Sequence, residues 1–193
     1  MSSYIAIDTE YGGFHPSASL LSVGFAVFNP ITGDVIDTMS LNIQHDIYSV
    51  DALALEVNKI NIPEHHKTAL PINECRSIAR KFLGKHCKGS DDYLIPVGSG
   101  ILGDIKMLKD NSFYTSKLSY KTRDITVIAS VLVDSGKLPQ MKVGLQNLAD
   151  YFGVNPGVPH SALDDAVTSA KVYWKLMNLV RGVEISPYEG CIS

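Results

Sequence analysis

The chain has 193 residues, of which 45% are hydrophobic and 19% are charged, and its net charge is −3. This composition excludes a disordered or fibrous protein, and the length allows a full hydrophobic core, so we expect one domain over residues 1–193. The slight acidity argues against a protein that holds nucleic acid through a generally basic surface. An enzyme that binds phosphates through divalent cations stays compatible with it.

The cysteines and the hydropathy pattern bear on the compartment. Cys75, Cys87 and Cys191 lack the spacing of zinc or redox sites, and an odd number of cysteines fits reduced thiols. The longest uncharged apolar run covers residues 125–133, far fewer than the roughly 20 that a membrane-spanning helix needs. We therefore expect a cytoplasmic protein with no membrane partner.

The first part of the chain has the patterns of β-strands. Residues 4–9 are an apolar run that predicts a buried strand. In residues 21–28, large apolar side chains alternate with Ser22, Gly24 and Ala26, so one face of this strand would accept a closely packed helix. After turn residues at 29–34, alternation from Met39 to Ile43 predicts an antiparallel hairpin.

The remainder alternates between helical and strand patterns. The apolar spacing predicts a strand over 93–97, a helix from Ile72 that ends at Gly84 or Gly89, and further helices over 104–109, 125–133, 143–152 and 162–180. Hairpin strands followed by alternating strands and helices indicate an α/β protein with a mixed sheet and helices on both sides.

Two carboxylates lie two positions apart on the first predicted strand. Asp8 and Glu10 therefore leave the same face of the sheet. Within an apolar strand such a pair is costly unless a cation or hydrogen bonds compensate it, which favours a divalent metal site. The alternative is a strand end with two solvated acids, and this segment alone favours neither.

A second polar group stands at the head of the last predicted helix. Ser161 with Asp164 three residues on fits a capping box, so Asp164 is interpreted as structural. Asp165 would point toward a neighbouring element, and His160, just ahead of the helix, is suited to act as a general base. The alternative for His160 is a surface histidine before a capped helix.

Asp104 stands in a glycine-bearing segment that follows a strand and opens a helix. Taken alone, this residue is more typical of a helix cap than of a catalytic site.

The order of these residues resembles the DEDD exonuclease superfamily, specifically its histidine branch. The matching segments are Ile7-Asp8-Thr9-Glu10, residues 20–24, Gly103-Asp104-Ile105, residues 145–153 and His160-Ser161-Ala162-Leu163-Asp164-Asp165, so the resemblance covers nearly the whole chain. The last motif is the most specific, and it aligns Asp165 as a metal ligand. One departure is that Ser99-Gly100 and Gly103 stand where relatives often carry His-Asn and Phe.

The resemblance implies a ribonuclease H-like fold, with a mixed five-stranded sheet whose second strand is antiparallel. It implies that four carboxylates hold two Mg²⁺ or Mn²⁺ ions and that His160 deprotonates the attacking water. The carboxylates are Asp8, Glu10, Asp104 and Asp165. Hard oxygen ligands and the lack of a Cys or His cluster argue against zinc.

The implied activity is removal of nucleoside 5′-monophosphates from a free 3′ end of single-stranded nucleic acid, with DNA slightly favoured. An exoribonuclease or oligoribonuclease that trims RNA is the nearest alternative, and a catalytically silent nucleic-acid-binding module is a more distant one. Some relatives act as dimers, so a homodimer is also considered.

Residues directly after Glu10 are candidates for substrate binding. Thr9 lies within the first motif, and Tyr11, Gly12 and Phe14 would offer backbone amides and an aromatic face to the terminal nucleotide. A glycine turn with two surface aromatics explains this segment equally well.

The basic residues of the helix that starts at Ile72 would steer the phosphate backbone or form a solvated face; they are Arg76, Arg80, Lys81, Lys85 and Lys88.

Overall fold

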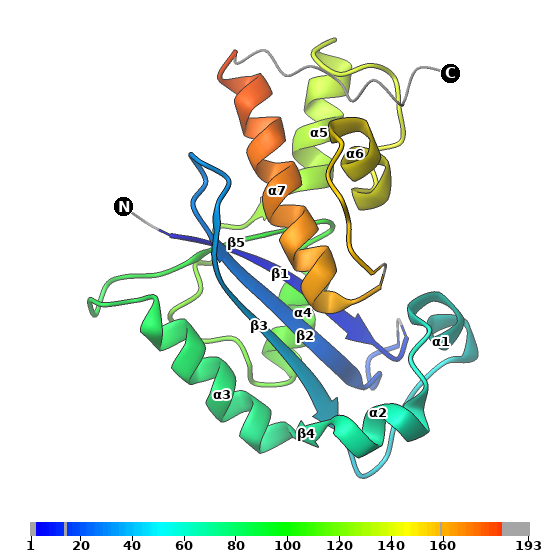
Figure 1. The fold of residues 1–193 in the computed structure, drawn as a ribbon. Coiled ribbons are helices and arrows are strands. Elements are labelled where there is room, and N and C mark those ends of the chain that lie inside the picture. The colour runs from blue at the N-terminus through cyan, green and yellow to red at the C-terminus, as the bar shows by residue number, and fades with distance from the viewer. Residues whose placement is uncertain (1–2, 14, 159, 183–193) are drawn as a thin grey trace.

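The computed structural model describes residues 3–13, 15–158 and 160–182. Helices cover both faces of a six-stranded sheet whose strand order is β4-β3-β2-β1-β5-β6 (Figure 1). The strands are β1 (Tyr4–Tyr11), β2 (Leu20–Phe28), β3 (Val35–Gln44), β4 (Leu70–Pro71), β5 (Ile95–Gly98) and β6 (Arg123–Asp124). The helices are α1 (Ala52–Asn58), α2 (Ile62–Thr68), α3 (Ile72–Lys85), α4 (Leu102–Asp110), α5 (Ile125–Asp134), α6 (Leu145–Phe152) and α7 (Ala162–Val180).

The strand directions confirm the predicted fold class. β2 pairs antiparallel with both β1 and β3, whereas β5 pairs parallel with β1, β4 with β3 and β6 with β5. The second strand is thus the one that runs against the others, as in a ribonuclease H-like sheet. The sheet has six strands, whereas the resemblance implied five and the apolar patterns predicted four. The patterns missed β4 and β6, because two residues each are too few to produce an alternation in the sequence.

Strands and helices stand where the sequence predicted them, with ends shifted by a few residues. Besides β4 and β6, the exceptions are α1 and α2, which the sequence did not predict. Each has seven residues, fewer than a periodic apolar stripe needs to be recognised. Both follow β3 and precede β4 in the chain. Figure 1 shows α1 beside the end of β1 and α2 beside β4.

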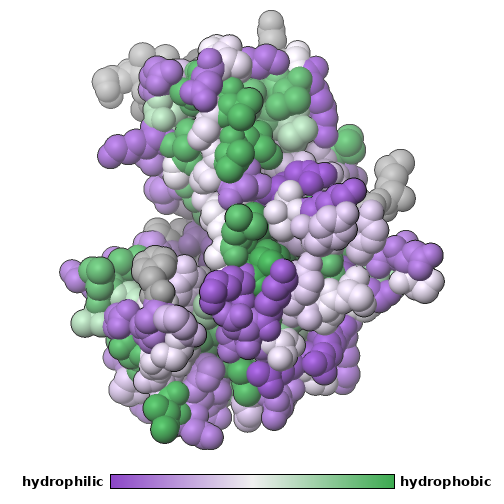
Figure 2. Space-filling view, turned by 180° about the vertical axis from the view of Figure 1, so that it is seen from behind, coloured by the Kyte–Doolittle hydropathy of each residue, from purple (hydrophilic) through white to green (hydrophobic). Residues whose placement is uncertain are grey.

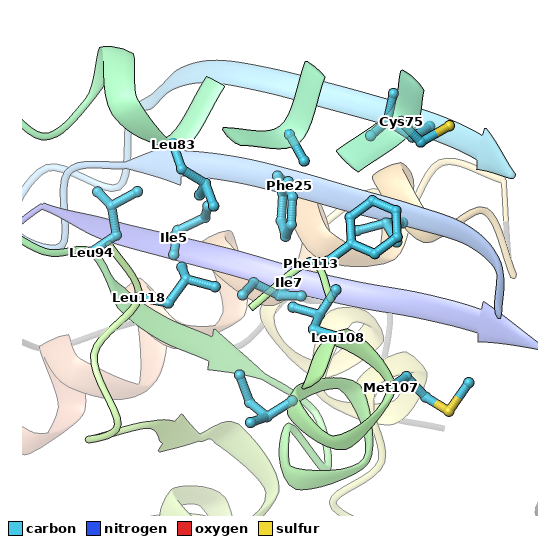
Figure 3. Close-up of a cluster of buried hydrophobic side chains, with 14 of the residues drawn as sticks. Ile5, Ile7, Phe25, Cys75, Leu83, Leu94, Met107, Leu108, Phe113 and Leu118 are labelled. Carbon is cyan, nitrogen blue, oxygen red and sulfur yellow. The ribbon is translucent and has the colours of Figure 1, made fainter. Parts of the chain in front are cut away.

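Each face of the sheet carries its own hydrophobic core. Ile5, Ile7 and Phe25 pack with α3 and α4 on one face (Figure 3). Ala6 and Ala26 pack with α5, α6 and α7 on the other. Because successive side chains of a strand point to opposite faces, Asp8 and Glu10 share the face of Ala6 and lie on the α7 side.

The small-residue face of β2 accepts a helix, as the sequence predicted. Gly24 is paired with Asp8 across the β1–β2 ladder. A methyl group added to Gly24 would overlap the backbone carbonyl of Ala162, the first residue of α7. The N-terminus of α7 therefore rests directly on the backbone of β2, next to Asp8.

Substitution of Gly24 tests this contact. We expect Gly24→Ala to lower the free energy of unfolding by about 1–3 kcal/mol, because the new methyl group has no space and α7 must shift. Gly84→Ala is the matched control, since nothing lies within 4 Å of the added methyl group and alanine is favoured over glycine within a helix. Urea unfolding would contradict the packing if Gly24→Ala were as stable as the parent protein.

Candidate active site

A cleft of about 400 Å³ is lined by residues from the carboxyl end of β1, the start of α7 and α1. It contains most of the residues that the sequence singled out. Its lining consists of Asp8, Thr9, Glu10, Tyr11, Gly13, Asp51, Leu53, Ala54, Val57, Asn58, His160 and Asp165.

Four carboxylates from three separate segments influence one another at this cleft. Burial raises the pKa of Asp8 well above its usual range, and the nearby charges of Asp104, Glu10 and Asp165 raise it further. Burial and the charges of Asp165 and Asp104 raise the pKa of Glu10 to about 8. Burial raises the pKa of Asp104 to about 7 and also raises that of Asp165. The structure thus brings together all four acids that the sequence predicted.

No lysine or arginine occurs among the described residues that line the cleft. Carboxylates that are held close together in a partly buried site cannot all ionise unless positive charge is supplied. Divalent cations supply it, and carboxylate oxygens are the donors that Mg²⁺ and Mn²⁺ prefer. The donor set therefore fits these ions.

A buried hydrogen bond holds the Asp104 carboxylate beside β1. It lies in the first turn of α4 and is only 6% exposed. The hydroxyl of Thr9 donates a hydrogen bond of 2.7 Å to its Oδ1 atom. Thr9 was predicted to bind substrate, and it does line the cleft, but its hydroxyl is committed to Asp104.

The start of α7 has the register that the sequence indicated. The Ser161 hydroxyl accepts a hydrogen bond from the Asp164 amide at 3.4 Å. The Asp164 carboxylate accepts a hydrogen bond from the amide of Val158 at 3.2 Å, so it holds the preceding loop in place. In a full capping box it would instead accept from the amide of Ser161. Asp165, one residue later, faces the cleft.

His160 lies beside two of the carboxylates. One potential ligand atom from each of Glu10, His160 and Asp165 lies within 4.8 Å of the other two. The His160 backbone is left-handed, with φ of 61°, and its amide donates to Asp165 Oδ2 at 3.2 Å. A left-handed non-glycine residue costs on the order of 1 kcal/mol, so the surrounding contacts must hold the His160 backbone in this conformation.

The other predicted binding residues have different surroundings. Tyr11 lines the cleft, where burial and the charges of Asp104, Asp8 and Glu10 raise its pKa. Gly12 does not line the cleft. A side chain on Gly12 would overlap the Ser49 carbonyl, so this glycine admits the loop that leads into α1.

Two further expectations concern residues outside the cleft. Phe14 lies outside the described residues. The basic residues of α3 do not line the cleft. Two of them have partners elsewhere: the Arg76 Nε atom donates to the Asn111 carbonyl, and Lys85 forms an ion pair with Asp37.

The sequence did not reveal the wall that α1 contributes, with Leu53, Ala54 and Val57. The apolar residues of this short helix could have been assigned to the cleft only if the position of the loop before α1 had also been known.

Comparison with known proteins gave matches in structure but not in sequence. No family model matches the chain, and no curated protein has a similar sequence. The nuclease domain of 3′hExo, a DEDDh family member solved with bound rAMP, matches with a TM-score of 0.66 and 18% identity, over 97% of this chain and 96% of that one. This chain has the fold of the DEDDh exonucleases.

Two other solved structures extend this finding. The Mg²⁺- and Mn²⁺-bound form of S. pombe Pop2p matches with a TM-score of 0.65 and 16% identity, over 95% of this chain and 86% of that one. E. coli exonuclease I in complex with a dT13 oligonucleotide matches with a TM-score of 0.69 and 13% identity, over 95% of this chain but only 42% of that one. None of the helices in the described part of this chain is long and apolar enough to cross a membrane.

The raised carboxyl pKa values predict a specific pH dependence. The pKa of Glu10 is raised from 4.5 to about 8, so between these values the folded protein binds more protons than the unfolded chain and loses stability as pH rises. Cations that replace those protons should restore it. We expect Mg²⁺ or Mn²⁺ to raise the melting temperature more at about pH 8.5 than at about pH 6.

Thermal unfolding at both pH values, with metal and with chelator, measures this difference. Asp8→Asn is the control that should lose most of the metal effect, because it removes a carboxylate from the centre of the group. Equal metal effects at the two pH values would contradict the electrostatic account.

Proposed function

We propose that this protein is a metal-dependent 3′–5′ exonuclease that hydrolyses phosphodiester bonds at the 3′ end of nucleic acid and releases nucleoside 5′-monophosphates. The observation that carries this proposal is the cleft lined by Asp8, Glu10, Asp165 and His160, with the buried Asp104 close enough for its charge to raise the pKa of Asp8. The nuclease domain of 3′hExo, which has the same fold, was solved with a nucleoside monophosphate.

The four carboxylates would hold two Mg²⁺ or Mn²⁺ ions, which stabilise both the attacking and the leaving oxygen in two-metal hydrolysis. Pop2p, which shares the fold, binds both of these metals. The contribution of the chain is to hold the donors in place. β1 fixes Asp8 and Glu10 on one face, Thr9 fixes Asp104, and α7 presents Asp165.

His160 would act as the general base that takes a proton from the attacking water. An imidazole accepts protons at neutral pH, and this residue is exposed at the cleft edge within reach of Glu10 and Asp165. Tyr11 and Phe14 are proposed to contact the terminal nucleotide, with Thr9 acting through Asp104. Gly12, which was expected to offer its amide, instead donates it to the Ser19 carbonyl at 2.8 Å.

The substrate is proposed to be single-stranded nucleic acid with a free 3′ end, with DNA slightly favoured and RNA as the alternative. Among structures that share the fold, E. coli exonuclease I was solved in complex with a dT13 oligonucleotide, and a 3′-exonuclease is described as recognising the histone mRNA stem-loop at its 3′ end. We further propose that residues 1–193 form one exonuclease domain that works in the cytoplasm as a monomer or homodimer.

Digestion of matched 5′-labelled single-stranded DNA and RNA tests the activity. We expect a ladder that shortens from the 3′ end with Mg²⁺ or Mn²⁺ and no cleavage with chelator. Asp165→Asn should lower the rate by at least about a hundredfold, because the carboxylate is needed at the reacting phosphate. Asp164→Asn is the matched control, whose main effect should be a loss of about 1 kcal/mol in stability through the bond to Val158.

His160→Gly separates chemistry from folding, because glycine adopts the left-handed backbone of this residue without strain. It should unfold at a similar urea concentration to the parent protein and yet lack activity. A fully active Asp165→Asn or His160→Gly variant would contradict the assigned roles. No cleavage of either substrate by folded protein would contradict the proposed function.

A further inference from the structure

A second pocket lies against the later part of α7, apart from the carboxylate cleft. Its volume is about 340 Å³, and its described lining shares no residue with that of the cleft. It is lined by residues 32–34 of the turn between β2 and β3, residues 153–155 after α6, and Lys171, Trp174 and Lys175 of α7. We call it the Trp174 pocket. In Figure 1 that turn and α1, which lines the cleft, lie at opposite ends of the sheet.

The walls of the Trp174 pocket are fixed by contacts within the protein. The Trp174 indole donates a hydrogen bond of 3.0 Å from Nε1 to the Ile31 carbonyl. Gly33 has a φ of 80° and lies against the indole, where an added methyl group would be 2.6 Å from Trp174 Cδ2. The Asn29 side chain accepts a hydrogen bond of 2.9 Å from the Ile31 amide, which closes the turn on itself. A site whose walls are already in place loses little conformational entropy when a ligand binds.

The Trp174 pocket carries an excess of positive charge. Lys171 and Lys175 stand one helical turn apart on α7, and both are half-buried at the pocket. Asp34 is the one carboxylate among the described lining residues, so the net charge is two minus one, or +1. Within the described residues neither lysine forms an ion pair, and Lys175 alone has an aromatic contact, with the Trp174 ring at 5.2 Å. Both ammonium groups are therefore available to an anion.

A phosphate group suits this arrangement. An ammonium group attracts phosphate as a point charge on a flexible stem, so two lysines one turn apart can share one phosphodiester. Asn155 also lines the pocket, and its Oδ1 atom accepts a hydrogen bond of 3.1 Å from the Gly157 amide. Its Nδ2 group is left as a further donor.

Helix α7 connects the Trp174 pocket with the cleft. Asp165 lies at the cleft, and Lys171 and Lys175 follow six and ten residues later. At about 1.5 Å per helical residue, these separations are about 9 and 15 Å along the axis. A stacked strand advances about 3.4 Å per nucleotide, so about four or five nucleotides span the longer distance. A strand whose 3′ end is in the cleft is thus long enough to reach the pocket.

The protein surface as a whole gives such a strand little general attraction. The chain has a net charge of −3, and the face seen in Figure 2 mixes hydrophilic with hydrophobic residues. Because lysine and arginine supply most of the attraction for a phosphate backbone, a strand that extends beyond the cleft depends on local cations.

We propose that the Trp174 pocket is a second contact for nucleic acid, at which Lys171 and Lys175 bind one phosphate of the strand, about four or five nucleotides before its 3′ end. The proposal rests on the proposed function and adds to it a site outside the carboxylate cleft. It makes the enzyme prefer strands that are long enough to occupy both places.

Trp174 reports directly on this pocket, because it is the only tryptophan of the chain. Its fluorescence is recorded while the complete chain, in Ca²⁺ in place of Mg²⁺, is titrated with oligothymidylates of about three and about twelve nucleotides, or with inorganic phosphate. The longer strand should change the emission and bind about tenfold more tightly than the shorter one, which should leave the emission unchanged. Inorganic phosphate should act only at concentrations at least about a hundredfold higher, because it lacks the anchor at the cleft.

Two lysine substitutions connect this binding to the pocket. Lys171→Glu should remove the emission change and reduce the affinity for the longer strand to that for the shorter one. It should also raise KM for long strands and leave kcat and the cleavage of short strands unchanged. Lys81→Glu is the matched control, because Lys81 is exposed on α3, lines neither the pocket nor the cleft, and changes the net charge equally. It should leave the binding of both strands unchanged.

Three outcomes would overturn the proposal: equal affinities for the two strands, an emission that the longer strand does not change, or equal effects of Lys171→Glu and Lys81→Glu. Inorganic phosphate that changes the emission as readily as the longer strand would also overturn it and assign the pocket to free phosphate. Failure of the proposed function is distinguishable, because the longer strand would still change the emission in Ca²⁺ while neither strand is cleaved in Mg²⁺ or Mn²⁺.

Discussion

The close contact between the start of α7 and the bare backbone of Gly24 is the constraint on which the site depends. Asp8 lies directly across the ladder from Gly24, and Ala162 rests on the glycine. Helix α7 can therefore present Asp165 to the carboxylates of β1, and the loop before it can hold His160 beside them. Catalytic geometry tolerates only displacements that are well under an ångström. A side chain at position 24 would thus affect chemistry through the position of the helix.

The electrostatics of the cleft oppose the stability of the fold. Burial and mutual repulsion raise the pKa of Asp8 and Glu10, and burial raises that of Asp104, so the ionised group is unfavourable until cations bind. The chain offsets part of this with the hydroxyl of Thr9, which donates to Asp104, and the amide of His160, which donates to Asp165. Local strain and unfavourable charge of this kind are common where a structure is arranged for function.

The sequence predicted the parts of the site that depend on strand parity and helix register. Asp8 and Glu10 share a face because they are two residues apart on a strand, and Ser161 fixes which acid of the next turn faces inward. It did not predict the wall formed by α1, the placement of Asp51 or the bond from Thr9 to Asp104. These depend on how a short helix and a distant loop pack against β1, which no local periodicity records.

Diffraction from crystals grown with Mn²⁺ and a nucleoside 5′-monophosphate would show whether the four carboxylates form a two-metal site. We expect two anomalous peaks about 3.5–4 Å apart, bounded by Asp8, Glu10, Asp104 and Asp165. A fully occupied nucleotide with no anomalous peak among these carboxylates would contradict the two-metal site.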